Sequence, residues 1–450
     1  MAKWAQWLVA VLAGGTAGVA QAQGVLPPPA EGLRFAASER VRFEAIDGQA
    51  RAGFNDSDQL VNFRTTLLAR YQHGAVSVVG ELWDSRAYNG NHGSPVTTGE
   101  VNTLEPVQAY VQLDLGAALG RGSKLKLQAG RFMLNLGSRR LVAADDYRNT
   151  TNGYTGVRAD WNAGRWAATA IYTMPQRRRP DDLDSLLANE PAIDREGAAL
   201  VLWGGLISRA RTIGPAMIET SYFHLGEHDT PGRATRDRSL DTASIRIARD
   251  PAPAKLDYEI EAIGQTGSQS VSLVRGAARQ SVRAWFVHGR VGYSWASAWK
   301  PRLMAEFDYA SGDAPGGHYG RFDTLFGMRR ADLAPAGLYN AIARSNVVAP
   351  SLQAEAAPDG RTELMLSYRP MWLAARTDAF SSTGVRDTAG RAGDFAGHQF
   401  DGRVRYRLSK AVRLEGDAVL LAKGRFLREA PNAPPGRWTK YGSLNLMVSL

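Results

Sequence analysis

The chain has 450 residues, a net charge of +10 at pH 7 and no cysteine. The lack of thiols excludes disulfides, cysteine nucleophiles and thiolate metal sites. The excess of lysine and arginine favours acidic partners, such as polysaccharides, lipopolysaccharide phosphates or nucleic acids.

The first 22 residues are organised like a secretory signal peptide. Lys3 precedes the apolar stretch 7–13, and residues 20–22 (Ala-Gln-Ala) form an A-x-A cleavage site. Glycines from residue 14 onward interrupt the apolar stretch well short of the ~20 residues that a membrane-spanning helix needs. We therefore expect a signal peptide over 1–22 and an exported domain over 23–450, which argues against a nucleic-acid partner.

From residue 33 onward the chain repeatedly alternates apolar and polar residues, as a β-strand does when its two faces meet different surroundings. In 123–129, for example, leucines alternate with Lys124, Lys126 and Gln128. The candidate strands are 33–46, 60–72, 75–86, 104–115, 123–129, 154–163, 165–174, 195–206, 215–225, 241–249, 255–265, 283–295, 299–310, 361–370, 371–378, 398–408, 411–422 and 441–450. They number about 18, and single-chain bacterial barrels have even numbers of strands.

The segment 285–295 indicates how far a strand extends. Trp285 and Trp295 share one face, so a fully extended strand separates them by ~33 Å. At a tilt of ~40° this distance projects to ~25 Å, the height of the apolar band of an outer-membrane barrel. A long sandwich strand with two buried tryptophans is the alternative.

The connections between these strands alternate between tight turns and long polar loops. Tight turns are expected at 162–164 and 409–410, and long loops at 87–102, 133–153, 176–194, 311–360 and 378–397. Short turns on one side and long loops on the other are typical of outer-membrane barrels. The sequence therefore predicts an all-β, transmembrane antiparallel β-barrel in the outer membrane of a Gram-negative cell.

One face of the segment 400–408 carries Arg403, Arg405 and Arg407, and the other face is apolar or small. In a transmembrane barrel the apolar face contacts lipid and the arginine face lines a water-filled lumen. The same alternation places three more cations on the lumen side: Arg64, Lys126 and Arg158.

The usual signatures of catalysis are absent from the sequence. There is no phosphate-binding glycine loop, no G-x-S-x-G and no H-E-x-x-H. Gly226 separates His224 from His228 in a strand-like segment, which argues against a paired metal site. The acidic pairs at 145–146 and 181–182 are expected to be solvated turns rather than Ca²⁺ sites. We therefore expect no enzymatic activity, no cofactor and no metal.

Three stretches between residues 130 and 158 resemble the signature of the alginate export family of outer-membrane barrels. They are G-R-F…L-G-S-R-R-L over 130–141, D-Y-R-N over 146–149 and G-Y-T-G-V-R over 153–158. The segments 307–312, 320–326, 397–401 and 422–426 resemble later motifs of the family, in the same order. The chain departs from the pattern at Tyr154, where an acidic residue is usual, and at Leu450, where barrels usually end in an aromatic residue.

The resemblance implies an 18-stranded barrel whose basic lumen lets an acidic polysaccharide such as alginate leave the cell. It adds four arginines, at or beside strand ends, to the candidate pore residues: Arg131, Arg139, Arg140 and Arg148. Guanidinium groups bind carboxylates through paired hydrogen bonds and stay charged, and rings of them make a pore anion-selective. Outer-membrane lipid, lipopolysaccharide and a periplasmic secretion protein are further candidate partners.

The main alternative is an anion-selective uptake porin for small acidic solutes on the same barrel. The loop expected at 311–360 distinguishes the two, because a plug that gates a polymer differs from a constriction sized for small solutes. Two further alternatives are an outer-membrane enzyme with a Ser/His or Asp/His pair at its rim and a soluble periplasmic carbohydrate-binding β protein.

Overall fold

The computed structural model describes residues 31–145, 147–328 and 333–450. The signal peptide expected over 1–22 lies outside these residues. Within the described residues, no helix is both long and apolar enough to cross a membrane.

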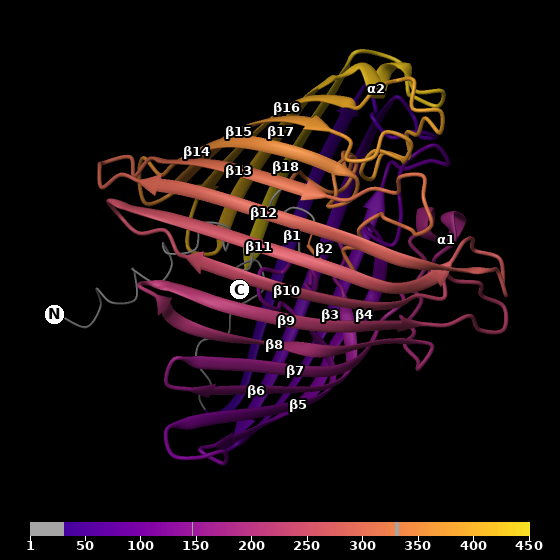
Figure 1. The fold of residues 1–450 in the computed structure, drawn as a ribbon. Helices are drawn as coiled ribbons and strands as arrows, with labels where there is room; N and C mark the ends of the chain where they lie inside the picture. Colours follow the sequence, from indigo (N-terminus) through magenta and orange to yellow (C-terminus); the bar gives the residue numbers. More distant parts are fainter. Residues whose placement is uncertain (1–30, 146, 329–332) are drawn as a thin grey trace.

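Eighteen antiparallel strands form a closed barrel (Figure 1). They are β1 Gly32–Asp47, β2 Ser57–His73, β3 Val76–Tyr88, β4 Asn102–Gly116, β5 Ser123–Met133, β6 Gly153–Ala163, β7 Trp166–Pro175, β8 Leu200–Ile213, β9 Ala216–Glu227, β10 Ser239–Arg249, β11 Lys255–Ser270, β12 Arg279–Ser294, β13 Arg302–Ala310, β14 Val347–Ala356, β15 Thr362–Trp372, β16 Phe395–Arg407, β17 Val412–Lys423 and β18 Trp438–Ser449. β1 pairs with both β2 and β18, so the ring closes without a free sheet edge. The predicted barrel of about 18 strands is confirmed.

Short turns join the strands at one end of the barrel and long loops join them at the other. The two short helices, α1 Leu183–Leu187 and α2 Arg425–Glu429, lie among the long loops, at the right of Figure 1. Because outer-membrane barrels have short periplasmic turns and longer extracellular loops, the long loops face the outside of the cell.

Two sequence predictions near the C-terminal third need correction. The loop expected over 311–360 ends at residue 346, because residues 347–356 form β14. The strand was missed because it contains Pro350. Proline has no N–H to donate, and the ladder between β14 and β15 is interrupted around this residue. The strand expected over 371–378 does not form, since β15 ends at Trp372 and the chain enters the loop 373–394. The two errors cancel in the strand count.

The two faces of the wall differ as the alternation predicts. On β16, Phe400 and Val404 are 47% and 50% exposed on the outside, whereas Arg405 is 6% exposed on the inside. Trp285 and Trp295 are both exposed on the outer surface, and Trp285 stacks on Tyr309 at 4.2 Å between ring centroids. The apolar face therefore meets lipid, and both tryptophans lie on it.

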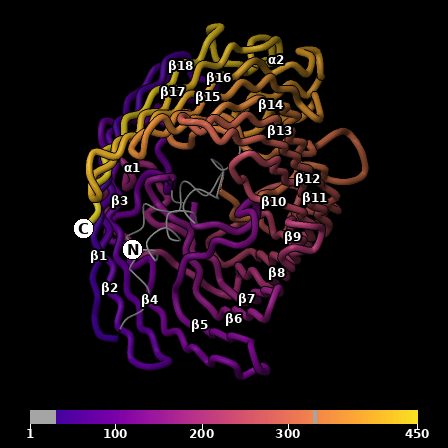
Figure 2. The backbone as a smooth tube through the Cα atoms, turned by 90° about the vertical axis from the view of Figure 1, so that its left-hand side faces the viewer, coloured from indigo at the N-terminus to yellow at the C-terminus, as the bar shows by residue number. Residues whose placement is uncertain are grey.

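The main apolar core lies inside the barrel, towards the long-loop end. Figure 2 looks into the barrel from the short-turn end and shows chain segments lying within the ring of strands. Buried loop residues in this core include Leu134, Leu141, Phe322, Leu338 and Ile342, packed with inward-facing strand residues. The loops thus fold back into the lumen and narrow it.

Candidate conduction path

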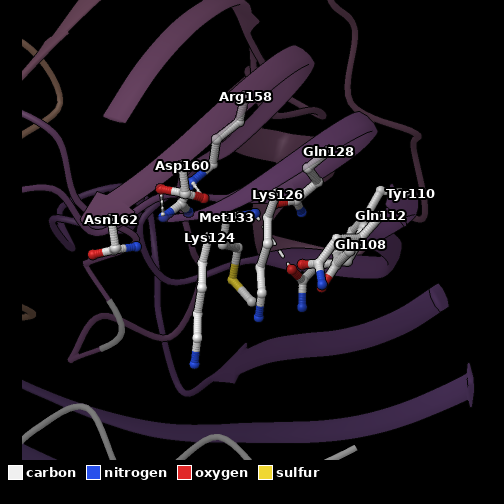
Figure 3. A pocket seen from close by; sticks show the side chains of 10 residues that line it. All are labelled: Gln108, Tyr110, Gln112, Lys124, Lys126, Gln128, Met133, Arg158, Asp160 and Asn162. Atoms are coloured by element: carbon white, nitrogen blue, oxygen red, sulfur yellow. Dashed lines mark hydrogen bonds and ion pairs between the residues drawn. The ribbon is translucent and has the colours of Figure 1, made fainter. Parts of the chain in front are cut away.

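The short-turn half of the lumen has a polar side wall formed by β4, β5 and β6. Its inward side chains surround a cavity of about 460 Å³ (Figure 3): Gln108, Tyr110, Gln112, Lys124, Lys126, Gln128, Met133, Arg158, Asp160 and Asn162. Lys126 lies 3.9 Å from Asp114, and Arg158 lies 2.7 Å from Asp160. The predicted lumen residues Lys126 and Arg158 therefore meet in one cavity.

The loop 134–152 crosses to a distant part of the wall. Arg140 on this loop is buried and forms ion pairs with Glu259 and Glu261 of β11, at 2.5 and 2.6 Å. Glu259 is also paired with Arg246 of β10 and Arg290 of β12. Buried charges are tolerated only when they are paired in this way. The loop is thus tied to the wall by an ion-pair network.

The loop 311–346 lies against the loop 134–152 inside the lumen. Val142 and Phe326 form a parallel bridge, and the amide of Ala143 donates to the carbonyl of Phe326 at 3.0 Å. Further along, the amide of Leu338 donates to Glu44 of β1, and the Tyr339 hydroxyl donates to Gln399 of β16 at 2.6 Å. Together the two loops form a constriction that is attached to several strands.

A row of arginines lies on the lumen face of β1 and β2 beside this constriction. Arg40 and Arg64 are direct cross-strand neighbours, and Arg42 follows Arg40 on the same face. Like charges placed directly opposite are destabilising. Here the row donates hydrogen bonds to loop carbonyls: Arg40 and Arg42 to Tyr147 at 3.1 and 2.7 Å, and Arg40 and Arg64 to Arg148 at 2.8 and 3.1 Å. Arg42 is also paired with Glu44 at 3.5 Å, so backbone carbonyls and a carboxylate both hold the row in place.

Two loop arginines extend the row towards the outside. Arg148 and Arg178 both donate to the Oδ1 atom of Asn152, at 3.0 and 2.9 Å. Burial and the neighbouring Arg148 lower the pKa of Arg178 to about 10, so it remains a cation at neutral pH. The arginines of β1 and β2 and these two loop arginines form one connected arginine cluster, in which Arg148 is also paired with Asp145 at 2.7 Å.

The structure places the other candidate pore residues in different surroundings. Arg64 lies in the cluster, with its guanidinium 4.5 Å from the ring of Trp83. Arg139 precedes Arg140 in the loop and has a positive φ of 65°. Arg131 lies on the face of β5 opposite to Lys126 and is paired with Glu105 and Glu196. It therefore braces the loop 176–199 through Glu196.

The three arginines of β16 face inward as predicted but are not equivalent. Arg405 is buried between Glu415 and Glu363, at 2.5 and 3.5 Å. Arg407 is exposed near the short-turn end, and its register partner on β17 is Arg413. Arg403 lies between these extremes, partly exposed on the same face.

Sequence reasoning missed three members of the arginine cluster. Arg40 and Arg42 share a parity in the predicted strand 33–46, and this regular spacing was the signal that could have found them. Arg178 lies in the arginine tract 177–179, and nothing in its local sequence indicates that the loop 176–199 turns inward.

The closed barrel, its lipid-facing apolar band and its charged, loop-narrowed lumen define an outer-membrane channel of the porin type. The family profile described as alginate export matches residues 32–438. The chain belongs to the alginate export family.

Solved structures with the same fold are porins of pseudomonads. The BenF-like porin of Pseudomonas fluorescens Pf-5 has a TM-score of 0.59 at 13% identity, covering 92% of this chain and 98% of that chain. OccD3 (OpdP) of Pseudomonas aeruginosa has a TM-score of 0.56 at 11% identity, with 95% and 93% covered. OccK2 (OpdF) of the same species, solved with glucuronate, has a TM-score of 0.55 at 12% identity, with 93% and 99% covered. At these identities the likeness establishes the fold alone. No curated protein gives a significant sequence match to the chain.

Proposed function

We propose that this channel passes an acidic polysaccharide of the alginate type out of the cell. The observation that carries the proposal is the arginine cluster beside the constriction. Arg40, Arg42 and Arg64 stand on the wall, and Arg148 and Arg178 approach them from two loops. Arg40, Arg42 and Arg64 are almost fully buried, so a solute at this level meets the positive potential of the cluster rather than its guanidinium atoms.

The chemistry of a polyuronate suits such a cluster. Each sugar carries one carboxylate, and guanidinium groups bind carboxylates through paired, charge-assisted hydrogen bonds. Transport requires several weak sites in succession, because a single tight site would hold the chain. OccK2 was solved with glucuronate, a single sugar acid, which supports the match between this barrel fold and sugar carboxylates.

In this role the barrel catalyses no reaction, and it has partners on its outer surface and in the periplasm. Lipid and lipopolysaccharide contact the outer apolar band, and a periplasmic secretion protein delivers the polymer to the short-turn end.

The test is current block in planar bilayers. Alginate oligosaccharides should interrupt the current through the wild-type channel. The variant Arg40→Gln should shorten each block about ten-fold, which corresponds to about 1.4 kcal/mol. Arg40→Lys keeps the charge and should retain most of the effect, and Arg279→Gln, outside the lumen, should match the wild type. Heat-modifiable gel mobility verifies folding. A cation-selective channel, or one that oligosaccharides do not block, contradicts the proposal.

Uptake of small acidic solutes is the second candidate function. The constriction formed by the loops 134–152 and 311–346 favours it, since two loops that pack together inside the lumen leave less room for a polymer. Liposomes loaded with alginate of graded length separate the two functions. Release of long chains supports export, and release of monosaccharides alone supports uptake.

A further inference from the structure

The wall formed by β4, β5 and β6 carries a set of polar side chains that is distinct from the arginine cluster. We propose that it is a separate binding site for a sugar carboxylate in the short-turn half of the lumen, where a polyuronate would first enter. This inference rests on the proposed function, because it names a second point at which the same class of solute is held.

The strand register arranges the site in adjacent rows. Gln112, Gln128 and Arg158 are cross-strand neighbours in one row. Lys126 lies in the next row between Asp114 and Asp160, and Lys124 is opposite Asn162 in the row nearest the short turns. All these side chains point inward, and Figure 3 shows most of them around the cavity. Cations and amides thus share one continuous surface.

The cations of this wall are only partly neutralised within the described residues. Asp160 is engaged by Arg158 at 2.7 Å. Lys126 is 44% exposed and its nearest carboxylate, Asp114, is 3.9 Å away. Lys124 is exposed and makes no ion pair with any described residue. A weak exposed pair contributes little stability, so both ammonium groups are available to a carboxylate in the lumen.

The amide side chains of this wall suit it to bind a sugar as well as an anion. Gln112 and Gln128 make no side-chain hydrogen bond with the described protein, whereas Gln108 is held by Glu81 at 2.5 Å. An amide both donates and accepts, which matches the hydroxyl groups of a sugar ring. Lysine beside paired amides therefore suits a uronic acid better than a simple inorganic anion, and a cavity of about 460 Å³ lies within the range of small-molecule sites.

The arginine cluster and this wall give the lumen two cationic regions, so the affinity for a uronate depends on the length of its sugar chain. A monosaccharide binds one region at a time, whereas an oligosaccharide that spans both binds the second without a further loss of translational freedom. The wall site therefore favours a polymer over its own monomer. This separates it from a general attraction of anions by a positive pore.

A lysine-acylation footprint tests the site without measuring transport. The purified barrel in detergent is treated with a water-soluble acylating reagent, and the modification of each lysine is followed by mass spectrometry. An alginate trisaccharide at about ten times its Kd should slow acylation of Lys124 and Lys126 about ten-fold. The carboxyl-reduced trisaccharide should not, and Lys300 and Lys410, in turns outside the lumen, should be acylated equally in all samples.

A variant pair gives the second measurement. The substitutions Lys124→Gln and Lys126→Gln together should weaken trisaccharide binding about ten-fold. Lys300→Gln with Lys410→Gln removes the same charge and should bind as the wild type does. Equal acylation with and without the trisaccharide, or equal protection by the reduced sugar, would overturn the site. Protection without passage of polymer through liposomes would support this site while overturning the proposed export.

Discussion

Arg140 and Glu259 join the loop 134–152 to β11 through an ion pair of 2.5 Å between Nη1 and Oε1, with both side chains almost fully buried. The loop connects β5 to β6, so this pair links it to a strand, β11, that is a neighbour of neither. A loop held only at its ends would sample many positions. The ion pair fixes it across the lumen, and the width of the path depends on it.

The first prediction concerns the loss of this attachment. Arg140→Gln should raise single-channel conductance and current noise, because the loop 134–152 is released from β11. It should also lower the free energy of unfolding by about 3 kcal/mol, since Glu259 and Glu261 lose a buried partner. Arg279→Gln breaks an exposed pair with Asp237 and should cost less than about 1 kcal/mol. Unchanged conductance in folded Arg140→Gln would mean that the loop does not narrow the path.

The second prediction separates two arginines that look identical in sequence. Arg407→Ser should lower anion selectivity, measured as a reversal potential in a salt gradient. Its stability should be unchanged or higher, because Arg407 faces the like charge of Arg413 across the strands. Arg405→Ser should lower the heat-modification temperature, because it leaves Glu415 buried with one fewer partner. Equal stability losses in the two variants would contradict this distinction.

The strands of the barrel wall were predictable because the side-chain pattern that specifies them lies within each short segment of sequence. Inward and outward neighbours alternate along each strand, and the sequence states the alternation directly. The prediction was wrong at β14, where Pro350 interrupts the ladder, and at 371–378, where Leu373 leaves the sheet. Both errors occur where backbone hydrogen bonding rather than side-chain pattern decides the structure.

The narrow part of the lumen was less predictable because its contacts are long-range. Arg140 meets Glu259 over more than a hundred residues of sequence, and no local pattern specifies that meeting. The family motif around 130–158 did identify the loop that makes it. It could not separate Arg140, which points to the far wall, from Arg131, which braces the loop 176–199.

The third prediction concerns the contact between the two lumen loops. The chain has no cysteine, so Val142→Cys with Phe326→Cys creates one defined pair at bridging positions. Mild oxidation should link the pair completely and leave conductance as in the reduced protein, because the loops are already together. Either single variant alone should show no change on oxidation. Slow or incomplete linking, or a fall in conductance on linking, would indicate that the loops separate in the conducting state.

The last prediction uses a buried carboxyl in the loop 176–199. Asp194 accepts hydrogen bonds from the amide of Arg179 at 2.9 Å and from Asn102 at 3.1 Å. Burial, partly opposed by these contacts, raises its pKa to about 6 from an ordinary value of 3.8. The folded loop therefore holds a proton more tightly than the unfolded chain does. Its stability is highest below pH 3.8 and falls as the pH rises to about 6, by up to about 3 kcal/mol.

Asp194→Asn keeps an acceptor for the Arg179 amide and removes the cost of burying the charge. Amide hydrogen exchange over residues 177–199 should therefore be slower than in the wild type at pH 7.5, after correction for the intrinsic pH dependence of exchange. At pH 4 the two proteins should be nearly equal, since wild-type Asp194 is then protonated. Glu190→Gln, an exposed carboxyl in the same loop, should match the wild type at both values. Faster exchange in Asp194→Asn at pH 7.5 would show that the ionised carboxylate stabilises the loop through its neighbouring arginines.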